Sequence, residues 1–355
     1  MKIGLIGLPN SGKTTIFNAL TRMEVPVNPY SDVKAEPNVA VVSVDDERLF
    51  SLTEMYRPKK TTGATIEMID FPGLKEGAAK DGFFTGNSMG WIKSTDALAM
   101  VLRNFHDDLK GDATPLGDID EINMEILFSD LMLIENRLRK IEWLQKRGRK
   151  TNIIALEERT VQKIAEHLNN NIPIRDIELD EDEQRIIRGF QFLTKKPFIV
   201  ILNSDEAVFG LNKDLINELE SSYNVIEFAG HFEMELSRLN DEEAGIFMED
   251  IGIRKSARER LTQFAYQTLG YVSFFTVGED EVRAWSIHGG DNAVKAASTI
   301  HTDLARGFIR AECFSYDELI ECGSEKRVRA NGHFRLEGKD YVVRDGDILS
   351  IRFSV

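Results

Sequence analysis

Short runs of apolar residues alternate with amphipathic stretches through the first part of the chain. The runs ALAMVL from Ala97 and FIVIL from Phe198 are apolar throughout, as are strands that a parallel sheet buries on both faces. This alternation predicts a doubly wound α/β domain. The predicted strands are Lys2–Ile6, Asn38–Val44, Thr65–Ile69, Ala97–Arg103, Phe198–Leu202 and Val225–Phe228, and the predicted helices follow Lys13 and cover Glu47–Met55 and Phe84–Ser94.

A different pattern runs from Asp118 to Lys195. Apolar residues spaced alternately by four and three give a helix one apolar seam, made of Leu127, Leu131, Ile134, Leu138 and Ile141. Gly148 in the segment RGRK interrupts this helix, and a second helix follows with Ile154, Val161, Ile164 and Leu168. Two helices joined by a short turn form an antiparallel hairpin. Because strand character resumes at Phe198, we expect the hairpin to be inserted within the α/β domain.

From Tyr271 the chain changes character again. Short β-type runs are separated by Gly and Asp turns, namely VSFFTV, EVRAWSI, FIRAECF, YVVRD and ILSIRFSV. They predict a small α+β module at the C-terminal end. The expected domains are therefore the first part of the α/β domain (1–117), the hairpin (118–195), the second part of the α/β domain (196–270) and the C-terminal module (271–355).

Composition excludes several classes of protein. The formal net charge of −15 disfavours wholesale coating of nucleic acid, although it leaves room for a local basic patch. Cys313 and Cys322 are too few for a disulfide framework. The N-terminus runs directly into a glycine motif, and no stretch of eighteen apolar residues occurs, so we expect no signal peptide and no membrane span. These features predict a cytoplasmic protein.

A phosphate-binding loop lies between the first strand and the first helix. GLPNSGKT, from Gly7 to Thr14, matches GxxxxGK[ST], and the flanking strand and helix are the context that this motif requires. Gly7 and Gly12 let the backbone N–H groups turn toward phosphate oxygens. Lys13 places a cation between the β- and γ-phosphates, the helix start adds partial positive charge, and Thr14 offers a hydroxyl to Mg²⁺.

The sequence DFPG follows a later strand and matches DxxG. Asp70 at the strand end is expected to hold Mg²⁺ through water, and the N–H of Gly73 to contact the γ-phosphate. With Lys13, Gly73 is therefore assigned a catalytic role. Leu74 stands where Ras-like enzymes carry a Gln that orients the attacking water. A leucine cannot orient water, so intrinsic hydrolysis is expected to be slow.

The strand from Phe198 leads into NSDE, where a guanine-specific enzyme has N-K-x-D. An Asp at the last position accepts the two adjacent donors of guanine, whereas adenine presents an acceptor at N1. Here Ser204 replaces the Lys and Glu206 replaces the Asp, which should weaken guanine recognition.

These segments together resemble the YchF/Obg-like ATPase family along nearly the whole chain. The likeness lies in GLPNSGKTTIFNALT, EPNVAVVSV, DFPGLKEGAAK, NSDE, HFEMELSRLNDEE, TVGEDEVRAWSI, IHTDLARGFIRAE and EGKDYVVRDGDILSIRF. The last three stretches look like the family's TGS domain, a ubiquitin-like β-grasp module.

The resemblance implies an ATP-binding P-loop domain, with GTP as the alternative nucleotide and a link to the ribosome. It also implies which residues bind the nucleotide. Those implied at the phosphates are Asn10, Ser11, Gly12, Lys13, Thr14 and Thr15, and those implied at the base are Asn203, Ser204, Glu206, Ala229 and Gly230. Mg²⁺ would be held by Thr14 and Asp70, and K⁺ beside Asn10 is left open as a second ion.

Several positions depart from the family pattern. The Thr expected two residues before EPN is Lys34, so Ser31 substitutes for it, the switch folds differently, or Lys34 itself contacts the γ-phosphate. The second switch reads DGFFTGNSMGW where a shorter Gly-rich segment is expected. The loop after FHDD is short and lacks the expected His, for which His106 is only a loose substitute. These departures bear on turnover more than on binding.

The predicted hairpin tip, Arg137 to Lys150, carries seven basic residues and one acidic one. In a chain of net charge −15 this local reversal suits the phosphates of RNA, although solvated hairpin ends are often basic as well.

The sequence thus predicts an ATP-binding, slowly hydrolysing molecular switch that engages the ribosome or RNA. The alternatives are a GTP-specific switch and a nucleotide-gated adaptor with little hydrolysis. A small-molecule kinase is disfavoured because no acceptor-binding lid is evident and because the NSDE loop is of the base-reading type.

Overall fold

The computed structural model describes residues 1–27, 36–74, 86–108, 111–250 and 253–354. Within these residues the chain divides into two units, and one comprises residues 2–40 and 67–257. The other comprises Met1, residues 41–66 and residues 258–355. In the part of the chain that is described, none of the helices is both long enough and apolar enough to cross a membrane.

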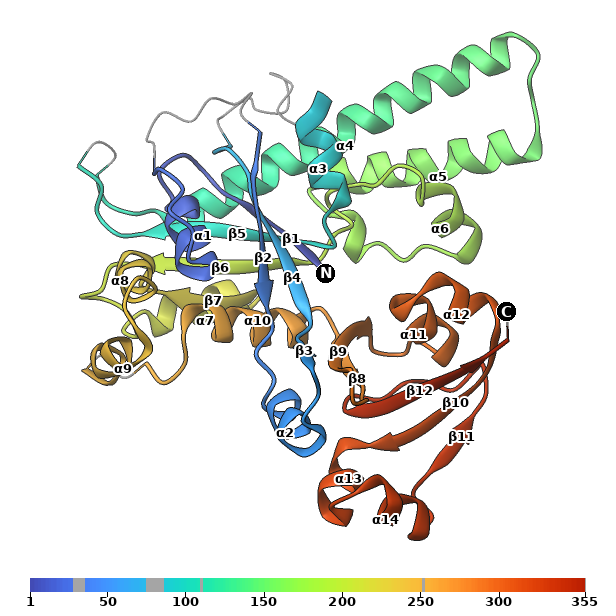
Figure 1. The fold of residues 1–355 in the computed structure, drawn as a ribbon. Helices are drawn as coiled ribbons and strands as arrows, with labels where there is room; N and C mark the ends of the chain where they lie inside the picture. Colours follow the sequence, from blue (N-terminus) through green and yellow to red (C-terminus); the bar gives the residue numbers. More distant parts are fainter. Residues whose placement is uncertain (28–35, 75–85, 109–110, 251–252, 355) are drawn as a thin grey trace. The chain divides into compact units, whose positions relative to one another are not determined.

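A six-stranded sheet has the order β2-β4-β1-β5-β6-β7 (Figure 1). β1 pairs in parallel with β4 and β5, and the parallel pairing continues from β5 through β6 to β7. Every residue of β6 is buried, as is all of β5 except its last residue. The strands are β1 (Lys2–Ile6), β2 (Asn38–Ser43), β4 (Thr65–Asp70), β5 (Ala97–Asn104), β6 (Phe198–Ser204) and β7 (Asn224–Phe228). The apolar runs therefore predicted these strands to within two residues, and the α/β fold is confirmed.

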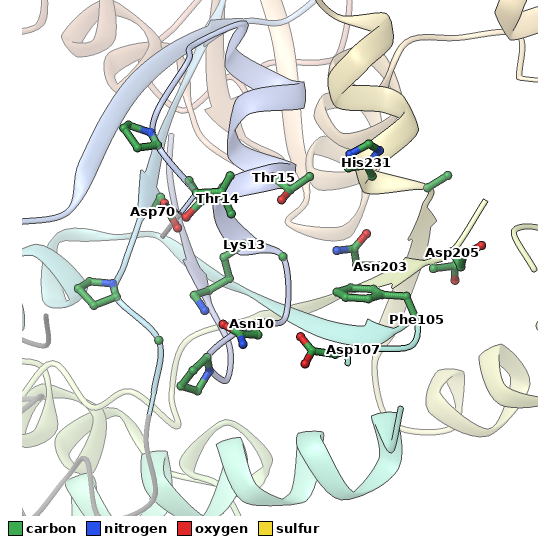
Figure 2. A pocket seen from close by; sticks show the side chains of 18 of the residues that line it. Asn10, Lys13, Thr14, Thr15, Asp70, Phe105, Asp107, Asn203, Asp205 and His231 are labelled. Atoms are coloured by element: carbon green, nitrogen blue, oxygen red, sulfur yellow. Dashed lines mark hydrogen bonds between the residues drawn. The ribbon is translucent and has the colours of Figure 1, made fainter. Parts of the chain in front are cut away.

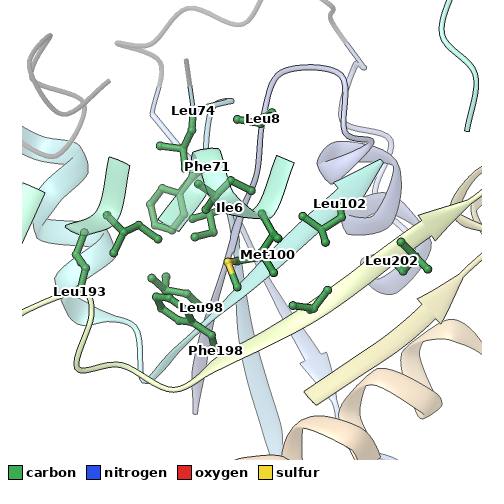
Figure 3. Close-up of a cluster of buried hydrophobic side chains, with 14 of the residues drawn as sticks. Ile6, Leu8, Phe71, Leu74, Leu98, Met100, Leu102, Leu193, Phe198 and Leu202 are labelled. Atoms are coloured by element: carbon green, nitrogen blue, oxygen red, sulfur yellow. The ribbon is translucent and has the colours of Figure 1, made fainter. Parts of the chain in front are cut away.

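Three helices lie between strands of this sheet along the chain, namely α1 (Lys13–Thr21), α3 (Gly86–Ser94) and α7 (Lys213–Glu220). Two more, α8 (Gly230–Leu236) and α9 (Asp241–Asp250), follow β7. One face of the sheet packs into an apolar core to which Ile6, Phe71, Leu98 and Met100 contribute (Figure 3). Leu74 belongs to the same core and is fully buried. This core fixes the strand ends from which the loops of the cavity described below emerge.

The predicted helical hairpin is present as α4 (Pro115–Lys146) and α5 (Asn152–Asn169) (Figure 1). Its seam is confirmed, because Leu127 and Ile134 of α4 pack with Val161, Ile164 and Leu168 of α5. The short helices η1 (Ile174–Asp176) and α6 (Glu181–Ile187) follow α5 and were not predicted. Their Ile174 and Ile187 complete the hairpin core.

The hairpin is anchored to the α/β domain at both of its ends. The first turns of α4 belong to the sheet core, because Ile119, Ile122 and Ile126 pack there. The exit is held by Asp130 of α4, whose carboxylate accepts hydrogen bonds from the N–H groups of Leu193 and Thr194 at 3.0 and 2.8 Å and from the Thr194 hydroxyl at 2.7 Å. Burial raises the pKa of Asp130 to about 6, against the effect of these donors. The returning chain is thus fixed just before β6 begins.

The second sheet has the order β11-β10-β12-β8-β9-β3. Its strands are β3 (Lys60–Thr62), β8 (Tyr271–Thr276), β9 (Glu281–His288), β10 (Phe308–Ser315), β11 (Arg335–Glu337) and β12 (Asp347–Phe353). The helices of this unit are α2 (Glu47–Tyr56), α10 (Ala257–Thr268), α11 (Ala293–Ile300), α12 (Thr302–Arg306), α13 (Tyr316–Cys322) and α14 (Glu325–Ala330). Ala296 of α11 packs on Phe274 and Leu349, as expected for a helix that covers a β-grasp sheet.

Two expectations about this unit need correction. YVVRD, from Tyr341, forms only an isolated antiparallel bridge and not a strand of the sheet, because Val342 pairs with Asn292 at the start of α11. Ala293 N donates to Tyr341 O at 2.8 Å and Val343 N to Asp291 O at 3.0 Å. Residues 41–66 were placed with the first domain, but β3 pairs in parallel with β9, as Lys60 with Glu281. By its contacts, this segment groups with residues 258–355.

Candidate functional site

Loops at the carboxyl ends of the parallel strands surround a cavity of about 980 Å³ (Figure 2). This edge of an open α/β sheet is where ligands bind. The lining residues are Pro9, Asn10, Gly12, Lys13, Thr14, Thr15, Pro26, Val27, Glu36, Asn38, Asp70, Phe71, Pro72, Gly73, Phe105, Asp107, Asp108, Asn203, Ser204, Asp205, Glu206, Ala229, His231 and Phe232. Most of the predicted site residues line this cavity, and Ser11 and Gly230 lie behind its surface.

The predicted phosphate loop curls tightly before α1. Gly12 has φ +84°, and a Cβ built on it would lie 2.1 Å from Nδ2 of Asn203. A side chain at this position is therefore excluded both by the backbone conformation and by the neighbouring amide. Gly73 approaches the loop from the end of β4, and a Cβ there would lie 2.9 Å from Cα of Pro9. Both glycines allow backbone to come close to the space that phosphates would occupy.

Lys13 is 6% exposed, and its ammonium group lies inside the loop. Nζ donates hydrogen bonds to the carbonyl oxygens of Gly7 at 3.0 Å and Leu8 at 2.9 Å. The cation is therefore positioned against backbone oxygens, at the centre of the group of residues drawn in Figure 2. From there it can turn to a phosphate oxygen without leaving the cavity.

Asp70, at the end of β4, lies beside Thr14 and Asn38. Its Oδ2 accepts a hydrogen bond from the Thr14 hydroxyl at 2.9 Å and from Nδ2 of Asn38 at 3.3 Å. Oδ1 is buried and has no hydrogen-bond partner among the residues that the structure describes. Burial raises the pKa of Asp70, and the charge of Lys13 opposes this rise. A buried carboxylate oxygen without a partner, next to a threonine hydroxyl, matches the hard oxygen ligands that Mg²⁺ prefers.

Leu74 directly follows the glycine of DxxG, and its side chain is fully buried among Ile6, Leu8 and Phe71 (Figure 3). Its N–H donates to the carbonyl oxygen of Gly7 at 2.9 Å. The side chain therefore points into the core, where it has no access to a water molecule in the cavity.

At the opposite end of the cavity, Asn203 connects two loops. Its Nδ2 donates to the carbonyl oxygen of Ser11 at 3.0 Å, and its Oδ1 accepts from the N–H of Gly230 at 3.0 Å. Asn203 was predicted to contact the base, but both ends of its amide are bonded to backbone. Its role in the structure is to hold the phosphate loop and the start of α8 together.

Ser204 was also predicted to face the base, yet it is 4% exposed. Its hydroxyl donates to Oε1 of Glu227 at 2.5 Å and accepts from Nδ2 of Asn104 at 2.9 Å. Glu206 instead lies exposed on the loop after β6, next to Asp205, and lines the cavity. Both substituted positions of the NSDE motif line the cavity, but Ser204 is buried and Glu206 is exposed.

Several lining residues were not predicted. Phe105, Asp107 and Asp108 follow β5, and His231 and Phe232 follow β7. The loop after β5 is held by the buried guanidinium of Arg103, which donates to the carbonyl oxygens of Phe105, Gly111 and Asp112 at 2.9, 2.7 and 2.9 Å. The signal that could have found these residues is their position directly after predicted parallel strands.

Three residues singled out in the sequence give no support here. Ser31 and Lys34 lie outside the described residues. His106 is described but does not line the cavity, and its Nδ1 lies 3.1 Å from Oδ1 of Asp112. It is therefore not placed to take the role of the histidine that the family pattern has in this loop.

Several of the basic side chains of the hairpin tip are paired with glutamates or stacked on an aromatic ring. Arg137 donates two hydrogen bonds, at 2.6 and 2.7 Å, to Glu157 of α5, and two further cations pair with glutamates along α4. Arg147 stacks over the ring of Trp143, with 3.9 Å between Cζ and the ring centroid. Arg149 and Lys150 are exposed in the connecting turn. The cations placed to meet a partner are therefore concentrated at the turn itself.

Comparison with known proteins gives matches along the whole chain. The family model described as "50S ribosome-binding GTPase" matches residues 2–137, and the YchF-GTPase_C model, described as a protein of unknown function, matches residues 271–354. A protein of Pasteurella multocida named "Ribosome-binding ATPase YchF" is 39% identical over 100% of this chain and 99% of its own length. The protein of that name from Bacillus subtilis is 36% identical, with 99% of each chain covered. The solved structure of the Schizosaccharomyces pombe YchF GTPase has a TM-score of 0.81 and 30% identity, and the match covers 99% of this chain and 97% of that chain.

Proposed function

The chain belongs to the YchF family of P-loop nucleoside triphosphatases, and we propose from this premise that it is a switch that binds Mg·ATP, hydrolyses it slowly and engages the ribosome. The observation that carries the proposal is Asp70, which lines the same cavity as Lys13 and Thr14 and whose buried Oδ1 has no hydrogen-bond partner within the described part of the chain. Burial of a carboxylate oxygen without a hydrogen-bond partner is unfavourable in free energy unless a ligand contacts that oxygen.

The phosphate end supports the binding of a triphosphate. The backbone N–H groups of residues 10–15 would meet its oxygens, and Lys13 would exchange the carbonyl oxygens of Gly7 and Leu8 for the β- and γ-phosphates. Thr14 and Asp70 would hold Mg²⁺, which neutralises charge on the phosphates. The N–H of Gly73 would contact the γ-phosphate. K⁺ beside Asn10, which lines the cavity, is a further part of the proposal.

Slow hydrolysis follows from the groups that face the cavity. Leu74 is buried in the core and His106 does not line the cavity, so neither orients an attacking water. Hydrolysis would depend on electrostatic stabilisation of the transferring phosphoryl group by Lys13 and Mg²⁺.

Preference for ATP is supported by Glu206, which lines the base end where a guanine-specific enzyme has an Asp, and by the name of the bacterial relatives. The competing proposal is a GTP-specific switch, which the names of the S. pombe protein and of the N-terminal family model favour. Calorimetric titration of Mg·ATP and Mg·GTP decides between them. A GTP affinity about tenfold or more above that for ATP, or about 1.4 kcal/mol, would replace ATP by GTP in the proposal.

Release of phosphate from ATP without an added acceptor would separate this function from that of a kinase. A single-turnover rate above the uncatalysed rate at saturating Mg·ATP would separate it from that of an adaptor with an inert nucleotide site. If neither release nor turnover is found, the proposed hydrolysis is wrong.

Association with the ribosome, the property in the names of the bacterial relatives, is proposed for the hairpin tip between Arg137 and Lys150. Arg149 and Lys150 are exposed, and the Arg147–Trp143 stack offers a cation and an aromatic ring together. Such a surface suits RNA phosphates and bases. We also propose that the protein is cytoplasmic, where ribosomes are, and that the domain boundaries are 117, 195 and 270, except that residues 41–66 group with the C-terminal unit.

Replacement of both Arg149 and Lys150 by Glu should weaken co-sedimentation with ribosomes at low salt, and the loss should shrink as salt rises, because phosphate contacts release counterions. The matched control reverses the charges of two exposed arginines in the same insert, Arg185 on α6 and Arg188 directly after it. Equal sedimentation of both variants and the wild type at low salt would remove the tip from the binding surface.

A further inference from the structure

We propose that Glu227 on β7 is a positioning residue for recognition of the nucleotide base, an inference that rests on the proposed function. Glu227 is not among the residues that line the cavity. Its side chain points instead at the loop of residues 205–211, which carries the base-facing carboxylates of Asp205 and Glu206. It would therefore act on the ligand only through this loop.

The carboxylate of Glu227 accepts hydrogen bonds from both ends of the loop. Oε1 accepts from the Ser204 hydroxyl at 2.5 Å, just before the loop, and from Nδ2 of Asn212 at 2.5 Å, just after it. Oε2 accepts from the N–H of Gly210 at 3.1 Å, inside the loop. Hydrogen bonds to a charged acceptor are stronger than those between neutral groups. One side chain thus closes the loop against the sheet.

Phe209 is half-buried, and the other residues of the loop are exposed. Leu211 is 76% exposed, and residues 205–208 are all exposed. Other hydrogen bonds join residues within the loop or next to it, such as that from Asn212 Nδ2 to Val208 O at 2.8 Å. Segments with few buried apolar contacts open at low cost, so their order depends on the polar contacts that tie them down. Glu227 holds the far end of this loop through its hydrogen bonds with Gly210 and Asn212.

The same residue also connects the loop to another lining residue. β7 ends at Phe228, directly after Glu227, and the next residue, Ala229, lines the cavity. The phosphate end is held by separate contacts, those of Lys13 with Gly7 and of Asp70 with Thr14. Loss of the Glu227 carboxylate should therefore weaken contacts to the base and leave contacts to the phosphates unchanged.

The test compares binding of Mg·ATP with binding of Mg·triphosphate, the inorganic chain that lacks ribose and base, by calorimetry. In Glu227→Ala the affinity for ATP should fall about tenfold, and that for triphosphate should stay within about twofold of wild type. Glu227→Gln should recover part of the loss, because its amide oxygen still accepts from Ser204 and Asn212 while its NH₂ group faces the N–H of Gly210. Glu220→Ala, which removes an exposed carboxylate at the end of α7, is the control.

Two results for Glu227→Ala would overturn the proposal. One is that neither affinity changes. The other is an equal loss for ATP and triphosphate, which indicates general structural damage. If Glu227→Ala does not fold, as judged by its thermal denaturation, Asn212→Ala removes one donor and should produce the same selective loss on a smaller scale. Failure of the proposed function has a different result: wild-type protein would bind ATP no more tightly than triphosphate, and the role of Glu227 would fall with it.

Discussion

At the phosphate end of the cavity the groups that face the ligand are buried, with Lys13 6% and Asp70 3% exposed. At the base end, Asp205 and Glu206 are exposed on a loop that a few side-chain hydrogen bonds hold. The first arrangement combines the continuous phosphate loop with Asp70 at the end of β4. The second depends on residues from three strands, β5, β6 and β7. From the proposed function we expect binding strength to be concentrated at the buried phosphate end. We expect selectivity to depend on the exposed base end, whose loop is held by Glu227.

The largest effect should come from Lys13→Ala. Loss of charge-assisted hydrogen bonds worth about 1.5–3 kcal/mol each should lower the affinity for Mg·ATP on the order of 100-fold. The fold should persist, because the ammonium group contacts phosphate only when nucleotide is bound. Thermal denaturation without nucleotide checks this. Calorimetry measures the affinity, and an affinity equal to wild type would show that Lys13 is wrongly assigned.

A smaller effect is expected from Asp70→Asn. The variant should lose most of the Mg²⁺ dependence of ATP binding and about tenfold in affinity, since the amide cannot replace the anionic ligand. Burial raises the pKa of Asp70, so the charged form is unfavourable in the protein without ligand. Thermal denaturation in the absence of Mg²⁺ should therefore show a stability equal to or above wild type. Unaltered Mg²⁺ titration curves would argue against this metal site.

The smallest effect is expected at the base end, from Glu206→Asp. The shorter carboxylate should move the ATP/GTP preference toward GTP by about 1 kcal/mol, less than for a buried pair because Glu206 is exposed and solvent competes for it. Ser204→Lys is not a suitable partner change, because position 204 is buried in hydrogen bonds with Asn104 and Glu227. Titration of both nucleotides gives the shift, and an increased preference for ATP would contradict the orientation proposed for Glu206.

The same contrast explains how much the sequence could predict. The phosphate end was predictable because its glycines, Lys13 and Thr14 are contiguous, and their spacing alone implies the backbone shape. Glu227 and Asn104 could not be predicted as partners of Ser204, since the three residues lie on different strands and meet only after the sheet forms. The pairing of β3 with β9 was missed for a related reason, because the register of Lys60 with Glu281 leaves no local pattern.

The amide of Asn203 has a consequence for how this protein can change by mutation. A Cβ on Gly12 would lie 2.1 Å from its nitrogen, and a Cβ on Gly230 would lie 2.4 Å from its oxygen, although the two glycines are far apart in the sequence. The three positions therefore cannot vary independently. Gly230→Ala should be tolerated better in a background where Asn203 is smaller, and that background would in turn lose the tie between the two loops. Such non-additive behaviour is expected of residues that share one contact. Where Asn203 joins the phosphate loop to the start of α8, single substitutions are therefore harmful and only coordinated ones can be accepted.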